Sequence, residues 1–124
     1  MGYLRRLGSW LSRLCSEEQK GSNPPPERLE IQRLWSVSTG HITSDDAKLL
    51  SQVNVDLVVT EYSEGFWVMV PPEGVSDAFL RELTAAGLST AIGHILSVAS
   101  SNNIDWVHFD SIAPLYTFLD QFHW

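Results

Sequence analysis

Hydrophobic residues near the start of the chain recur at helical spacing. Four leucines share one face of a helix, with basic side chains mostly off that face. At 1.5 Å per residue such a helix is roughly 20 Å long, too short for a bilayer core of about 30 Å. Residues 1–16 therefore predict a short basic amphipathic helix, and its predicted contact face consists of Leu4, Leu7, Trp10, Leu11 and Leu14.

Residues 17–28 contain no apolar residue except proline, and three prolines stand in a row. A proline run favours an extended polyproline II conformation and forbids a helix or a central strand. We therefore expect a tether here, and a folded body over residues 29–124.

In the first half of the body, residues 34–39 alternate and predict a strand. Thr43 to Asp46 resemble a helix N-cap, and that helix is expected to end near residues 52–54. Residues 55–62 and 66–70 are rich in β-branched and aromatic residues. They predict a hairpin in which Gly65 supplies a positive φ.

In the second half, Ser76 is a candidate helix N-cap, and Ser89 begins either a second helix or a continuation of the first. Asn102 with Asn103 is a helix stop. Residues 104–109 alternate again and predict a last strand. The order β-α-β-β-α-(α)-β, in which the second of the two consecutive helices is optional, predicts an α+β fold, with about four mainly antiparallel strands and helices on one face.

Charge divides the chain unevenly, although the net charge is −7. Residues 1–34 carry +2, whereas residues 35–124 hold two basic and eleven acidic groups, a net charge of −9. Such a body repels nucleic acid, since phosphate binding needs Lys and Arg, and it attracts basic protein surfaces. The alternative is that the acidity serves solubility alone.

Cys15 is the only cysteine, which excludes an intramolecular disulfide framework and a cysteine-based zinc site. A reducing, cytoplasmic location is the natural expectation. The basic helix has three alternative uses: self-docking or self-association, binding to an anionic membrane surface as a peripheral protein, or binding to another protein's groove.

Three histidines are candidates for catalysis or metal binding. His41 begins an H-x-T motif, but phosphoesterases of that kind need a second copy, which the chain lacks. His108 and Asp110 face one side of a strand, yet two ligands are too few for most metals. We expect no cofactor, no metal and no catalytic residue; a small hydrolase using His41, His94 and His108 is the lesser alternative.

Acidic side chains spread over several elements are candidates for a docking surface. A terminal tryptophan is a candidate anchor, because Trp is enriched at binding hot spots. The predicted partner-binding set is Asp45, Asp46, Asp56, Glu61, Glu64, Asp110 and Trp124.

Several motifs from residue 35 onward resemble a family of uncharacterised small domains found in bacterial genomes, plasmids and prophage-like elements. They are the His41-Ile-Thr43 step, the Tyr62-x-x-Gly65-Phe-Trp-Val hairpin and the Asp105-Trp-Val-x-Phe-Asp110 strand. The segment from Phe118 to Trp124 is longer than the ending usual in that family. The resemblance implies a mobile-element context and no particular chemistry.

The leading hypothesis is a non-enzymatic interaction protein that binds and inhibits or regulates a basic, nucleic-acid-handling protein. The resemblance adds an anti-defence or toxin–antitoxin setting. A peripheral membrane or assembly factor, addressed by residues 1–16, is the alternative.

Overall fold

The computed structural model describes residues 29–52 and 57–124. All the elements described below belong to one compact unit, Arg33–Trp124. The predicted helix over residues 1–16, with its contact face, and the predicted linker lie outside the described residues. Among the helices that are described, none has the length and apolar character needed to cross a bilayer.

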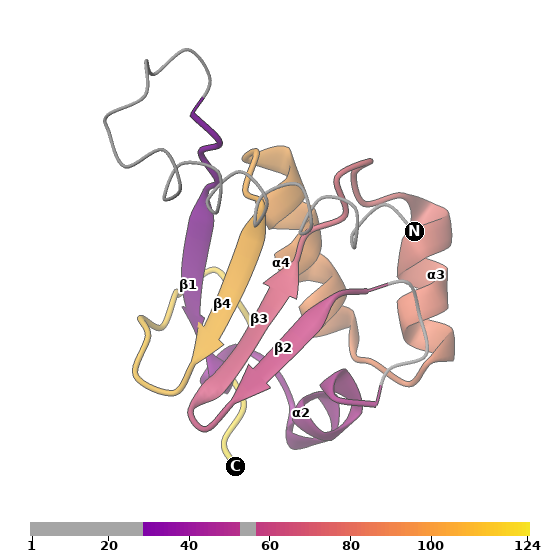
Figure 1. The fold of residues 1–124 in the computed structure, drawn as a ribbon. Coiled ribbons are helices and arrows are strands. Elements are labelled where there is room, and N and C mark those ends of the chain that lie inside the picture. Colours follow the sequence, from indigo (N-terminus) through magenta and orange to yellow (C-terminus); the bar gives the residue numbers. More distant parts are fainter. Residues whose placement is uncertain (1–28, 53–56) are drawn as a thin grey trace. The chain divides into compact units, whose positions relative to one another are not determined.

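The element order is the predicted one (Figure 1). The elements are β1 (Leu34–Ser38), a 3-10 turn η1 (Thr39–His41), α2 (Ser44–Leu50), β2 (Val59–Tyr62), β3 (Gly65–Met69), α3 (Asp77–Ala85), α4 (Thr90–Ser101) and β4 (Trp106–Asp110).

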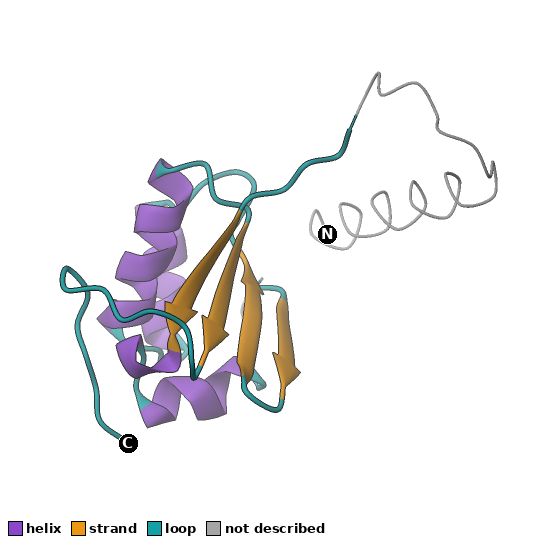
Figure 2. Ribbon diagram, turned by 90° about the vertical axis from the view of Figure 1, so that its left-hand side faces the viewer, coloured by secondary structure: helices purple, strands orange, loops and turns teal. Residues whose placement is uncertain are grey.

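The four strands form one sheet in the order β1-β4-β3-β2. The pairs β2–β3 and β3–β4 are antiparallel, whereas β1 and β4 run parallel. The helices lie together on one side of the sheet (Figure 2). The predicted α+β class and mainly antiparallel sheet are therefore confirmed, and the parallel pair at one edge is the added detail.

Strand alternation divides the sheet into two chemically different faces. Val37, Val68, Val107 and Phe109 are buried beneath the helices, where Ile92 and Leu96 of α4 join the same hydrophobic cluster. The residues between them point the other way, because successive side chains of a strand alternate. We call this second side the open face, since no described helix covers it.

Asp46 connects the beginnings of α2 and α4. Its carboxylate completes a capping box with Thr43 and also accepts hydrogen bonds from the Ser89 amide (2.8 Å) and the Ser89 hydroxyl (2.5 Å). The predicted cap at Thr43 is confirmed. Asp46 is only 1% exposed, so it holds two helices together and offers no carboxylate to a partner.

Gly65 has a different role from the one predicted. Ser63 and Glu64 form the hairpin turn, and Gly65 is the first residue of β3. Within the described chain, only Gly74 and Gly87 are glycines with positive φ. A Cβ at Gly65 would lie 1.8 Å from the Phe109 carbonyl oxygen, so glycine is needed here because the backbone of β4 passes so close.

Candidate functional site

His41 is fully buried and makes two hydrogen bonds to the C-terminal tail. Nδ1 lies 2.6 Å from the Asp120 carbonyl oxygen, and Nε2 accepts the Tyr116 amide at 2.8 Å. A carbonyl only accepts and an amide N–H only donates, so the ring is neutral with its proton on Nδ1. Both nitrogens are occupied by the backbone, and His41 has neither left for substrate.

The tail that His41 holds runs back along β1 and η1. Ser38 donates its amide to the Pro114 carbonyl (3.1 Å), and Phe122 donates its amide to the Gly40 carbonyl (2.7 Å). The Trp124 indole N–H reaches the Ile42 carbonyl at 2.9 Å. These bonds place the aromatic end of the tail beside η1 and α2.

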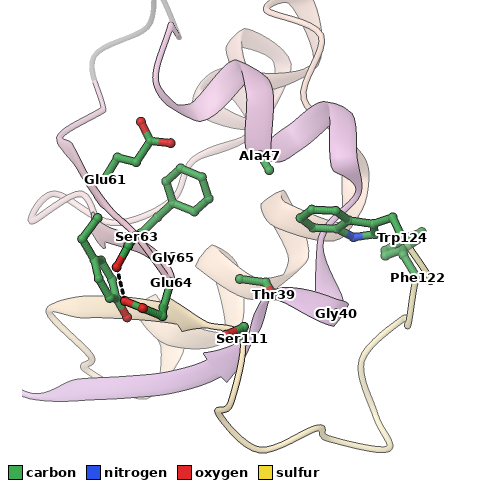
Figure 3. A pocket seen from close by; sticks show the side chains of 12 residues that line it. Thr39, Gly40, Ala47, Glu61, Ser63, Glu64, Gly65, Ser111, Phe122 and Trp124 are labelled. Atoms are coloured by element: carbon green, nitrogen blue, oxygen red, sulfur yellow. Dashed lines mark hydrogen bonds between the residues drawn. The ribbon is translucent and has the colours of Figure 1, made fainter.

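Trp124 forms one wall of a pocket at the tip of the hairpin (Figure 3). The pocket has a volume of about 450 Å³. We call it the hairpin pocket, and its lining residues are Thr39, Gly40, Ala47, Glu61, Tyr62, Ser63, Glu64, Gly65, Phe66, Ser111, Phe122 and Trp124.

The hairpin pocket combines acidic and apolar walls. Glu61 and Glu64 contribute carboxylates from the hairpin side, and Phe122 and Trp124 contribute rings from the tail (Figure 3). Ser63 donates its hydroxyl to Glu64, whereas Glu61 has no hydrogen-bond or ion-pair partner in the described part of the chain. Among the described residues that line the pocket, none is Lys or Arg. The pocket is therefore suited to a cation attached to an apolar stem.

A second cluster, the open-face network, links three strands. Tyr62 of β2 donates its hydroxyl to the Asp110 carboxylate of β4, and His108 Nε2 lies 2.5 Å from the same phenolic oxygen. Since the phenolic proton goes to Asp110, His108 donates from Nε2. At the other side of the ring, Nδ1 lies 3.3 Å from the Ser36 hydroxyl of β1.

Aromatic rings cover the network. The Trp67 ring stacks on His108 with centroids 4.3 Å apart and planes inclined by 22°, and the Tyr62 ring lies 5.7 Å from it. The His108 side chain is only 17% exposed as a result. Stacked rings of this kind hold the imidazole in a fixed orientation.

The network shifts the titration of two of its members in opposite directions. Burial, together with the hydrogen bond to Asp110 and the negative charges of Asp110 and Glu64, raises the pKa of Tyr62 to about 12. The bond donated by Tyr62 is the main cause that lowers the pKa of Asp110, and the Ile112 amide adds to it. At neutral pH the phenol is protonated and Asp110 is ionised.

The strand register explains how Tyr62 reaches β4. Tyr62 is opposite Gly65 on β3, and Gly65 is opposite Asp110 on β4. With no side chain at Gly65, the phenol can lie across β3. The sequence contains the motifs Tyr62-x-x-Gly65 and His108-x-Asp110, but nothing in it gives the register that joins them, so the network was not predicted.

The geometry of the network does not favour catalysis. Backbone amides of a sheet lie in its plane and belong to the ladder, so the open face presents no row of amides to a developing oxyanion. A phenol with a pKa near 12 is also a poor proton donor or acceptor at neutral pH. The network is better suited to fixing side chains in position.

The three candidate histidines occupy three different places. His41 is engaged by the tail and His108 by the network, while His94 is exposed and lines a separate hollow between α3 and α4. The shared hydrolase site considered above is not assembled in this arrangement. Within the described ranges, no group of three or more His, Cys, Asp or Glu could hold a metal ion.

The predicted docking residues are distributed unevenly. Glu61, Glu64 and Trp124, from two distant parts of the sequence, line the hairpin pocket. Asp110 belongs to the open-face network, and Asp45 is exposed on α2. Asp46 is buried, as described above, and Asp56 lies outside the described residues.

Comparison with known proteins identifies a family and no activity. Searches of curated proteins and of solved structures each returned no significant match. A family model described as the C-terminal domain of a family of unknown function (DUF5983) matches residues 34–124, the whole sheet, the helices and the tail. The resemblance to an uncharacterised domain is thereby confirmed, and this chain belongs to the family DUF5983.

Proposed function

We propose that this protein is an interaction protein, which binds a basic segment of a partner protein in the hairpin pocket and thereby inhibits or regulates that partner. The observation that carries the proposal is the gathering of Glu61, Glu64 and Trp124 around one pocket whose lining, over the part of the chain that the structure describes, includes no Lys or Arg.

Charge complementarity defines the occupant. Residues 35–124 carry a net charge of −9, so a positively charged segment is attracted over a long range. Within the pocket, the Glu61 side chain has no partner among the described residues to give up before it pairs with a cation. A Lys or Arg stem can pack on Phe66 and Ala47 while its charged end faces the carboxylates.

Trp124 supplies the apolar part of the contact. Its side chain is 63% exposed although its indole N–H is already bonded to the Ile42 carbonyl. A ring held in place with its polar atom satisfied loses little on desolvation, and it can also interact with a cation across its face. Such a side chain is a suitable anchor for a partner.

Proteins that handle nucleic acids are the partner class we propose, because they present Lys and Arg to bind phosphate. If the hairpin pocket binds one of those Lys or Arg side chains, nucleic acid can no longer bind it, and the partner is inhibited. The anti-defence or toxin–antitoxin setting stays a prediction that rests on the family resemblance alone.

The proposal is tested by neutralising the pocket without changing its shape. The variant Glu61→Gln/Glu64→Gln should bind a fluorescein-labelled peptide of alternating arginine and leucine roughly tenfold more weakly, since each exposed charge pair contributes up to about 1 kcal/mol. Binding by the unaltered protein should weaken as salt is raised.

The control is Glu73→Gln/Glu82→Gln, which removes the same charge at two exposed positions outside the pocket. We expect this variant to bind within about twofold of the unaltered protein, because distant exposed charges are screened. Equal weakening by both variants would reduce the effect to net charge and would refute a pocket-specific site.

A further inference from the structure

We propose that Tyr62 is a positioning residue for the hairpin pocket: its hydroxyl, held by His108 and Asp110, fixes the wall that carries Glu61 and Glu64. This inference rests on the proposed function, and it assigns to the open-face network a role in binding at that same pocket.

Tyr62 belongs to both clusters. It is among the residues that line the hairpin pocket, and its hydroxyl is bonded to Asp110 and His108 in the network. A change in the open-face network can therefore reach the hairpin pocket through a single residue.

The hairpin needs this additional interaction to fix its position, because β2 is short and lies at the edge of the sheet. β2 contains four residues, and in the sheet it pairs only with β3. Tyr62 gives it a direct bond to β4, one strand further in. The Ser111 amide adds a second hold by donating to the Glu64 carbonyl at 3.1 Å.

Each of these two contacts is made next to, or at, a residue of the acidic wall. Tyr62 follows Glu61 directly, and Glu64 is the last residue of the turn before Gly65. Fixing these positions reduces the conformational freedom that Glu61 and Glu64 would otherwise lose on binding. A preorganised site binds more tightly for that reason.

The network is well composed for holding a phenol. The charged or titratable groups that face the Tyr62 hydroxyl are Asp110 and His108 on β4 and Glu64 in the turn. Ser36 on β1 and Trp67 on β3 complete the contacts to His108 without adding charge. A bond to a carboxylate is stronger and more directional than one between neutral groups.

The variant Tyr62→Phe tests this role directly, since phenylalanine keeps the aromatic ring and removes only the hydroxyl. A matched control is Tyr116→Phe, which deletes a hydroxyl bonded to the Ser36 carbonyl oxygen and lies outside the pocket. Both variants are made in the full chain, and their folding is checked by circular dichroism.

The first measurement is hydrogen exchange of the amides of residues 61–65 in the free protein. Tyr62→Phe should raise their exchange rates several-fold, and Tyr116→Phe should leave them unchanged. Unchanged rates in Tyr62→Phe would overturn the inference whether or not any peptide binds.

The second measurement is the affinity for the labelled arginine–leucine peptide. Tyr62→Phe should weaken it about tenfold, in keeping with the loss of a bond to a charged group, and Tyr116→Phe by less than about twofold. In the unaltered protein, the imidazole resonances of His108 should also shift when the peptide is added. That shift should be absent from Tyr62→Phe, which a purely structural role for the hydroxyl would not require.

The outcomes separate the inference from the function on which it rests. If the unaltered protein fails to bind the peptide, the proposed function falls and the inference falls with it. If the unaltered protein binds and Tyr62→Phe binds equally well, only the inference is overturned. Should Tyr62→Phe not fold, Asp110→Asn replaces it: the amide keeps an acceptor for the phenol and loses the charge, so affinity should fall about threefold, and unchanged affinity would contradict the inference.

Discussion

His41 fixes the C-terminal tail against the end of β1 through both ring nitrogens. Replacing it with alanine would leave the Tyr116 amide unpaired and open a cavity in a fully buried site. We expect His41→Ala to lower the free energy of unfolding by about 2–4 kcal/mol. Urea denaturation followed by tryptophan fluorescence measures this change.

His94→Ala is the matched control, because His94 is exposed on α4 and no hydrogen bond of its ring occurs in the described part of the chain. This variant should stay within about 0.5 kcal/mol of the unaltered protein. Similar losses in both variants would contradict the structural role given to His41.

At the scale of single elements, the hairpin depends on the protonation of the open-face network. Asp110 has a pKa below its ordinary value of 3.8, so it stabilises the fold above that pH, and the contribution is lost as the pH falls through the folded-state pKa. The pKa of Tyr62 is raised from 10.0 to about 12, so its contribution is complete below pH 10 and is lost as the pH rises from 10.0 to about 12.

Stability should therefore decline at both ends of the pH range, and Tyr62→Phe should flatten both declines, since it removes the phenol and the bond that lowers the pKa of Asp110. Chemical denaturation at a series of pH values tests this. A profile in Tyr62→Phe that runs parallel to the unaltered one would show that the network does not control the hairpin.

Local patterns in the sequence predict these elements well. Alternation predicts β1 and β4, and the Thr43 and Ser76 caps mark the starts of α2 and α3. Register is different, because it depends on how strands distant in the sequence pair. The proximity of Tyr62 to Asp110 arises from two successive pairings through Gly65, and no local pattern contains that information.

At the scale of the whole molecule, the excess of acidic groups is a property of composition, whereas the pocket is a property of the fold. Composition gives the net charge of −9 over residues 35–124 and with it the expectation of a basic partner. The pocket arises because the tail returns along η1 and places Trp124 opposite Glu61. Both residues were predicted from the sequence to bind a partner, but the sequence contains no information that they line the same pocket.

The packing of the whole molecule also explains why Asp46 does not belong to the partner-binding surface for which it was predicted. Asp46 stands in an acidic stretch beside Asp45, yet burial makes it a link between α2 and α4. An exposed carboxylate can bind a partner, whereas a carboxylate that another segment of the chain covers can only bond within the fold. For Asp46 the covering segment lies some forty residues later in the chain, where the Ser89 hydroxyl donates to its carboxylate.

The most direct test of the central claim is to map, by two-dimensional NMR of the full chain, which resonances change when the arginine–leucine peptide is added. We expect the largest changes at the amides of residues 61–66 and at the Trp124 indole N–H, with little change on α3. Changes centred on α3 and α4, or no saturable change at all, would contradict binding at the hairpin pocket.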